Sequence, residues 1–199
     1  MAPPATPPPS WRESFDSLDP ARWQVPARPE HVAVRDGRLE MSLPPDATSL
    51  SVTHRRAVPF VQRAAVFDLD FQYNHGAHDR YLMMGWLITA TAQGGSEYLR
   101  LRIEGDANNG RVWIENHEAP ASNFTYRLTP QAVFATGRPH HLRLRLDRER
   151  VRLELDGQVV GEALHGCDFA SAYSQLGVQS GHRGQGDVCW WDNFAVSYE

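Results

Sequence analysis

Apolar and polar residues alternate strictly in two parts of the chain. Residues 97–104 read Glu-Tyr-Leu-Arg-Leu-Arg-Ile-Glu, and residues 140–147 read His-His-Leu-Arg-Leu-Arg-Leu-Asp, followed by a third alternating run at 151–157. A period of two is the period of a β-strand, since successive side chains point to opposite faces of a sheet. We therefore predict antiparallel strands here, each with one buried face and one face open to solvent or ligand.

The polar face of these predicted strands is rich in arginine. Such a face is either a ladder of salt bridges between neighbouring strands or a surface that binds anions. Its residues are Tyr98, Arg100, Arg102, Arg143, Arg145 and Arg152.

The rest of the chain shows almost no helical periodicity. Asp36-Gly37 and Asp156-Gly157 are strong hairpin signals. Residues 18–23 could form a single helical turn capped by Asp19. The longest expected loop is 119–137, anchored by apolar residues that include Val133 and Phe134. Short strands without helices predict an all-β fold, a two-sheet antiparallel β-sandwich or jelly roll. The expected strands cover 11–16, 31–35, 38–43, 49–54, 64–73, 80–90, 97–104, 110–116, 140–147, 150–156, 158–163, 174–180 and 188–198.

Length and charge narrow the classes of function. The chain has 199 residues and a net charge of −4. This length favours one domain, at 11–199, after a proline-rich arm or linker at 1–10. The charge gives no reason to expect nucleic acid or anionic lipid as a partner, and no stretch has the ~20 apolar residues of a membrane span. All twenty basic side chains are arginine, a planar fork suited to carboxylate, sulfate or phosphate.

Cysteine content and the N-terminus leave two questions open. Cys167 and Cys189 form one bridge in an oxidising compartment or lie buried as small apolar residues, and we favour the second. The first residues lack the features of a signal peptide. We expect a cytoplasmic protein or one secreted with its signal removed.

Four segments form a recognisable order along the chain. They are an aromatic opening strand and Leu-Asp-x-x-x-Trp at 13–23, an Asp-Gly-x-Leu strand at 34–39, a His-bearing hairpin at 137–158 and a closing Trp-Trp-Asp-Asn-Phe strand at 190–194. Taken in this order, they resemble the concanavalin A-like lectin/glucanase superfamily, most closely the arrangement of family-16 glycoside hydrolases. The resemblance implies a jelly roll with a concave groove. Non-catalytic proteins share this fold, so the fold alone does not decide function.

The catalytic strand of family-16 hydrolases is not matched. The resemblance implies Glu-x-Asp-x-Glu near residues 97–104, where the polar face instead reads Tyr98, Arg100, Arg102 and Glu104. Retaining hydrolysis needs two carboxyl groups about 5–5.5 Å apart. The next strand offers Glu115 and His117, an acid/base pair with one carboxylate. Ordinary family-16 hydrolysis is therefore not expected.

We predict a non-catalytic, lectin-like domain that binds a saccharide or polysaccharide, acidic ones included, in the groove. The alternatives are a glycan-degrading enzyme, either a polysaccharide lyase or an atypical glycoside hydrolase with Glu115 and His117 as catalytic residues, and a cytoplasmic protein of the same fold that binds another small molecule. The predicted ligand-binding residues are Trp86, Tyr98, Arg100, Arg102, Trp113, Glu115, His117, His141 and Arg143.

The resemblance also implies a structural calcium ion away from the groove. Its ligands would be the Asp192 carboxylate, the Gly37 carbonyl and a carbonyl near Glu13, and calcium accepts such oxygen donors. The alternative is that Asp192 caps backbone donors where the two ends of the domain meet.

Overall fold

The protein is described by a computed structural model that covers residues 9–25, 29–43, 49–59, 63–74, 82–89, 98–105, 108–117, 125–167, 171–179 and 188–199. For residues 29, 82–84, 87–89, 117, 125 and 126 the description extends to the backbone only. Residues 1–8 of the predicted arm, Glu97 and the side chain of His117 lie outside it.

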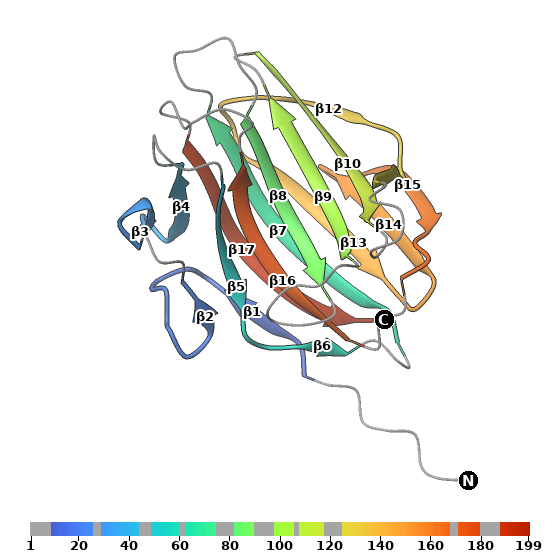
Figure 1. The fold of residues 1–199 in the computed structure, drawn as a ribbon, viewed down its shortest axis with the longest axis horizontal. Coiled ribbons are helices and arrows are strands. Elements are labelled where there is room, and N and C mark those ends of the chain that lie inside the picture. The colour runs from blue at the N-terminus through green and yellow to red at the C-terminus, as the bar shows by residue number, and fades with distance from the viewer. Residues whose placement is uncertain are drawn as a thin grey trace, which may run out of the picture.

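Two antiparallel sheets lie face to face and form a β-sandwich (Figure 1). Sheet A has the order β15-β14-β13-β7-β17-β4-β3, with β1 also paired to β17. Its strands are β1 (Trp11–Glu13), β3 (Val32–Arg35), β4 (Arg38–Ser42), β7 (Ala65–Asn74), β13 (His140–Leu146), β14 (Arg150–Leu155), β15 (Gln158–Leu164) and β17 (Val188–Tyr198).

Sheet B has the order β11-β10-β9-β8-β16-β5-β2, with β12 also paired to β10 and β6 to β16. Its strands are β2 (Trp23–Gln24), β5 (Ser49–His54), β6 (Val58–Pro59), β8 (Leu82–Thr89), β9 (Tyr98–Gly105), β10 (Asn109–His117), β11 (Thr125–Arg127), β12 (Ala132–Ala135) and β16 (Ser171–Gln179). One 3-10 turn, η1 (Pro29–His31), precedes β3. Among the described residues, no helix is long and apolar enough to cross a bilayer.

The predicted alternation is confirmed in both sheets. Buried and partly exposed residues alternate through the whole of β9, and β14 alternates in the same way. The inward side chains form one core between the sheets, in which Trp86 packs edge-on against Phe67 and Phe194 at ring-centroid distances of 5.4 and 5.8 Å. Cys167 and Cys189 are buried thiols, as the favoured interpretation expected.

Both predicted Asp-Gly hairpins are confirmed. Asp36 and Gly37 have φ angles of 52° and 74°, and Asp156 and Gly157 have 49° and 77°. Positive φ at both central residues is the geometry that follows the twist of two paired strands.

The hydrogen bonds confirm the predicted single helical turn at 18–23. The Asp19 carbonyl accepts from the Trp23 N–H at 2.8 Å, and Asp19 Oδ1 accepts from the Ala21 N–H at 2.8 Å, just before the chain enters β2. One local prediction is wrong. The expected loop at 119–137 contains β11 and β12, and Val133, expected to anchor it, is 66% exposed. Phe134 is buried against Phe71, because the strand pairing of β12 turns alternate side chains inward.

Candidate functional site

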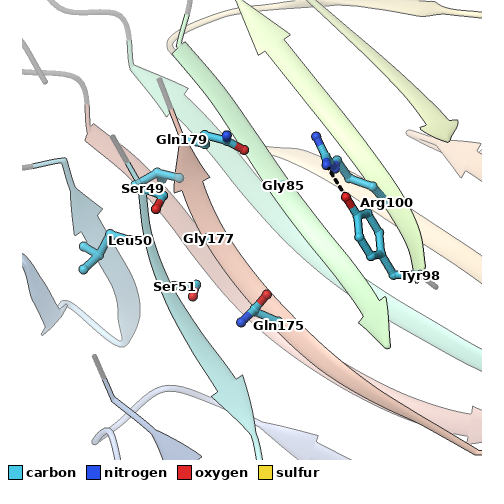
Figure 2. Close-up of a pocket in the computed structure, with 10 residues that line it drawn as sticks. Ser49, Leu50, Ser51, Gly85, Tyr98, Arg100, Gln175, Gly177 and Gln179 are labelled. Atoms are coloured by element: carbon cyan, nitrogen blue, oxygen red, sulfur yellow. Dashed lines mark hydrogen bonds between the residues drawn. The ribbon is translucent and has the colours of Figure 1, made fainter. Parts of the chain in front are cut away.

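A pocket of ≈ 360 Å³ lies on the outer face of sheet B, and its floor is made by two glycines (Figure 2). Gly85 of β8 is paired directly with Gly177 of β16. A Cβ at Gly85 would meet nothing within 4 Å, so the space above this residue is open. Two adjacent glycines remove side chains from the middle of the sheet and leave a shallow depression of bare backbone.

One side of the pocket carries hydroxyl and amide groups. Ser49 and Ser51 of β5 stand opposite Gln179 and Gly177 of β16, and Gln175 lies further along the same face of β16. These groups both donate and accept hydrogen bonds. Figure 2 shows the serines and glutamines on one side of the glycine floor. We call this set the polar rim.

The other side of the pocket carries Tyr98 and Arg100 of β9. The Arg100 guanidinium donates to the Tyr98 hydroxyl at 2.7 Å and lies 5.4 Å from the centre of its ring, as Figure 2 shows. The pocket therefore spans β9, β8, β16 and β5. Three inter-strand spacings of about 4.8 Å make it roughly 14 Å across, and an aromatic ring and a cation face neutral polar groups over that width.

A buried carboxylate, Glu115, lies next to the pocket on β10. Its Oε1 accepts a hydrogen bond from the indole N–H of Trp113 at 2.8 Å and another from Arg102 at 3.3 Å. Glu115 is 5% exposed, and its Oε2 is buried with no hydrogen-bond partner among the described residues.

Arg102 joins this carboxylate to a second one. Its Nε donates to Glu104 Oε1 at 2.7 Å, and its guanidinium lies 5.4 Å from the centre of the Trp113 ring. Arg127 approaches the same ring to 5.2 Å. Trp113 is 3% exposed, so the two arginines cover the ring where a sugar would have to stack. This half of the outer face of sheet B is therefore a ladder of salt bridges. That was one of the two interpretations of the arginine-rich face that the sequence left open.

The structure brings together five of the predicted ligand-binding residues on the outer face of sheet B. Strand pairing sets Tyr98 opposite His117, Arg100 opposite Glu115 and Arg102 opposite Trp113. The five with described side chains are Tyr98, Arg100, Arg102, Trp113 and Glu115. His117 occupies the register position opposite Tyr98, and its side chain is outside the described residues.

The prediction that Trp86 is one of the ligand-binding residues is wrong. Trp86 is 0% exposed and belongs to the core between the sheets. Its neighbours across the two strand pairs are Leu101 and Leu176, which are also buried. It therefore lies on the inner face of β8, opposite to Gly85.

The prediction that His141 and Arg143 share this site is also wrong. Both lie on β13 in sheet A, where they face Asp70 and Asp68 of β7. His141 Nδ1 lies 2.7 Å from Asp70 Oδ1, and Arg143 Nη1 lies 3.5 Å from Asp68 Oδ1. They point outward as expected, but from the opposite side of the sandwich.

The proposed calcium ligands lie where the ends of the domain meet. The position of a Gly37 Cβ is 3.9 Å from the Ser14 carbonyl oxygen, so these two backbone segments are in contact. Asp192 Oδ1 accepts a hydrogen bond from the Asn193 N–H at 2.7 Å, and Arg38 lies 3.9 Å from Oδ2. Within the described ranges, no group of three His, Cys, Asp or Glu side chains could hold a metal. These residues fit a cation only if backbone carbonyls supply most of its ligands.

The polar rim and the glycine floor were not identified from the sequence. A signal for them exists, since every second position is polar in 49–53 and is polar or glycine in 173–179. That alternation marks an outer face. It does not tell which strands are neighbours, and the pocket exists only because β5, β16, β8 and β9 lie side by side.

This sandwich is the concanavalin A-like jelly roll, and the solved structures that resemble it share that fold. No protein-family model matches the chain, and no curated protein matches it.

Three similar structures are glycan-degrading enzymes by their descriptions. SCLam, a non-specific endo-β-1,3(4)-glucanase from family GH16, superposes with a TM-score of 0.72 at 13% identity, over 99% of this chain and 94% of its own. The endo-1,3-β-glucanase (laminarinase) catalytic domain from Thermotoga petrophila RKU-1 gives 0.68 at 13% identity, covering 95% and 96%. The κ-carrageenase from Pseudoalteromonas carrageenovora, solved with an oligotetrasaccharide of κ-carrageenan, gives 0.65 at 9% identity, covering 98% of each chain. At these identities the likeness shows the fold.

Proposed function

We propose that this chain binds a saccharide in the pocket on the outer face of sheet B and does not cleave it. The observation that carries the proposal is the glycine floor between the polar rim and the Tyr98–Arg100 pair. Hydroxyl and amide groups suit the many hydroxyls of a sugar, and bare backbone lets a ring lie close to the sheet. Structures of similar fold that are described as glucanases and a carrageenase support a saccharide as the ligand class.

Arg100 gives the pocket a preference for acidic saccharides. Its guanidinium has five N–H donors in a planar fork, and one of its nitrogens donates to Tyr98. A guanidinium matches a carboxylate or sulfate on a sugar in charge and geometry, and such charge-assisted hydrogen bonds are about twice as strong as neutral ones. We therefore expect the ligand to be a saccharide that carries an acidic group on every sugar residue or on every second one.

The carboxylates beside the pocket support binding without cleavage. Retaining and inverting hydrolysis both need one carboxyl group to give a proton and another to act as nucleophile or base. Glu104 and Glu115 are both hydrogen-bonded to Arg102. One guanidinium therefore engages Oε1 of both carboxylates, and these oxygens face Arg102 rather than a glycosidic oxygen or a water.

The second candidate function is catalysis, and one observation favours it. Glu115 Oε2 is buried and has no partner among the described residues, which is unusual for a carboxylate in a structural ion pair. Arg102 also bridges Glu115 to Glu104, so a ligand that displaced Arg102 would release two carboxylates on the outer face of sheet B. In this function Glu115 acts as the acid or base, with His117 as its predicted partner.

The test compares two arginine variants. Arg100→Gln removes the cation of the pocket, and Arg143→Gln removes a cation of the same type from the outer face of sheet A. Affinities for neutral and uronate- or sulfate-bearing oligosaccharides are measured by isothermal titration calorimetry. The proposal expects binding of acidic oligosaccharides that weakens at least tenfold in Arg100→Gln and is unchanged in Arg143→Gln. Equal affinities in all three proteins would assign the ligand to another surface.

A further inference from the structure

A second cavity, of ≈ 450 Å³, lies where the start of the domain meets the end of β5. It shares no lining residue with the glycine-floored pocket. Its walls come from β1, from the turn before β2 and from the residues that follow β5. The lining residues are Trp11, Arg12, Glu13, Ala21, Arg22, His54, Arg55 and Arg56. We call this cavity the arginine pocket.

The arginine pocket concentrates positive charge in a protein whose net charge is −4. Four of its lining residues are arginines and one, Glu13, is acidic. Arg22 pairs with Glu13 at 3.3 Å and lies 3.6 Å from Asp19. Glu13 thus offsets Arg22 and leaves the charges of the other three arginines without an acidic residue in the lining.

The other three arginines are held by uncharged groups. Arg12 donates to the side-chain oxygen of Asn193. Arg55 donates to the Pro20 carbonyl at 3.1 Å. Arg56 donates to the Pro9 carbonyl at 3.3 Å and lies 5.4 Å from the centre of the Trp11 ring. Among the described residues none of these three has a carboxylate at ion-pair distance, and each retains N–H groups that an anion could accept from.

The frame that holds these arginines is fixed by backbone hydrogen bonds. The Arg55 N–H donates to the Arg22 carbonyl at 2.7 Å, and the Arg22 N–H donates to the Asp19 carbonyl at 3.0 Å. The turn before β2 and the residues after β5 are thereby joined before any ligand binds. A prearranged set of donors loses less entropy on binding than a set of free surface side chains.

His54 supplies an uncharged wall to the pocket. It is buried, stacks on Trp11 at a centroid distance of 4.4 Å, and accepts a hydrogen bond from the Arg56 N–H at its Nδ1. Its Nε2 lies 3.4 Å from Glu13 Oε1, so this nitrogen is the one that donates. His54 and Arg22 thus contact the same carboxylate, that of Glu13.

We propose that the arginine pocket binds a small oxyanion, such as phosphate, sulfate or carboxylate, through Arg12, Arg55 and Arg56. Planar guanidinium groups recognise these anions in bidentate fashion, and several of them around one cavity favour a doubly charged anion over chloride. This site is independent of the saccharide pocket and of whether that pocket is catalytic.

The test uses calorimetric titrations with two probes, inorganic phosphate and D-glucuronate, at constant ionic strength set by sodium chloride. Phosphate represents a free oxyanion, and glucuronate represents a carboxylate carried on a sugar. The proteins are wild type, Arg55→Gln/Arg56→Gln, and Arg148→Gln, which removes one exposed cation elsewhere. Saturable binding of at least one probe is expected, with Kd at least tenfold higher in the double variant and unchanged in Arg148→Gln.

One further variant keeps the result decisive. Arg12→Gln leaves the Arg55–Pro20 contact in place and is expected to weaken binding even if the double variant fails to fold. Absence of saturable binding, or equal Kd in wild type and the arginine-pocket variants, would overturn the proposal. Both outcomes leave the saccharide pocket untouched.

Discussion

Replacing Gly85 by valine should block the saccharide pocket without harming the fold. Gly85 lies in the middle of β8, and a Cβ placed there meets nothing within 4 Å. Its φ is not among the positive values in this chain, so an L side chain needs no change of backbone. The new isopropyl group would stand on the pocket floor, in the space assigned to a sugar ring.

The substitution should leave the free energy of unfolding equal or higher, while it weakens saccharide binding. Glycine in a strand interior is destabilising by roughly 0.5–1 kcal/mol relative to alanine, and valine favours strands further. The Gly85→Val variant should therefore be as stable as wild type or up to about 1 kcal/mol more stable. Excluding one sugar ring from the pocket floor should raise the Kd for the saccharide at least tenfold, which corresponds to about 1.4 kcal/mol of binding free energy.

The paired glycine provides a control with a different outcome. A Cβ at Gly177 would lie 2.9 Å from the Leu50 carbonyl oxygen and 3.1 Å from Ser51 Cβ, so Gly177→Ala must displace backbone and should lower stability. Urea denaturation gives the stabilities, and titration with the best-binding oligosaccharide gives the affinities. Unchanged saccharide affinity in a folded Gly85→Val protein would refute the placement of the ligand on the glycine floor.

Three further predictions concern the surroundings of the pocket and the ends of the domain. Trp113→Phe removes the N–H that donates to buried Glu115 and should cost about 1–3 kcal/mol of stability in urea denaturation. Burial lowers the pKa of His54 despite the opposing effect of Glu13; because the unfolded chain then takes up the proton first, stability should fall as pH drops below about 6.5. A His54→Gln variant should show a smaller decrease. If calcium binds at the predicted site, it should raise the Tm of wild type but not of Asp192→Asn; an equal rise in both would reject that site.

Alternation along the chain predicts which side chains point outward, and it does so best where the period is strict. The outward set Tyr98, Arg100 and Arg102 is confirmed in β9. The prediction from alternation fails for Trp86, because residues 82–88 are apolar or glycine throughout. Such a run has no polar positions to distinguish the inner from the outer face.

Alternation also gives no information on which sheet a strand joins. His141 and Arg100 both point outward, yet they lie in sheets A and B. Sheet membership depends on pairing between strands far apart in the sequence. The floor of the pocket has the same origin, since Gly85 and Gly177 meet only through the pairing of β8 with β16.

The most direct test of the central claim is product analysis on the bound saccharide. Wild-type protein is incubated with the oligosaccharide that binds best, and new reducing ends and unsaturated products are followed by chromatography and mass spectrometry, with Glu115→Gln alongside. The account predicts binding in both proteins and products in neither, since Arg102 holds both carboxylates beside the pocket. Products that appear with wild type and disappear with Glu115→Gln would contradict it and assign the chain to the enzymes.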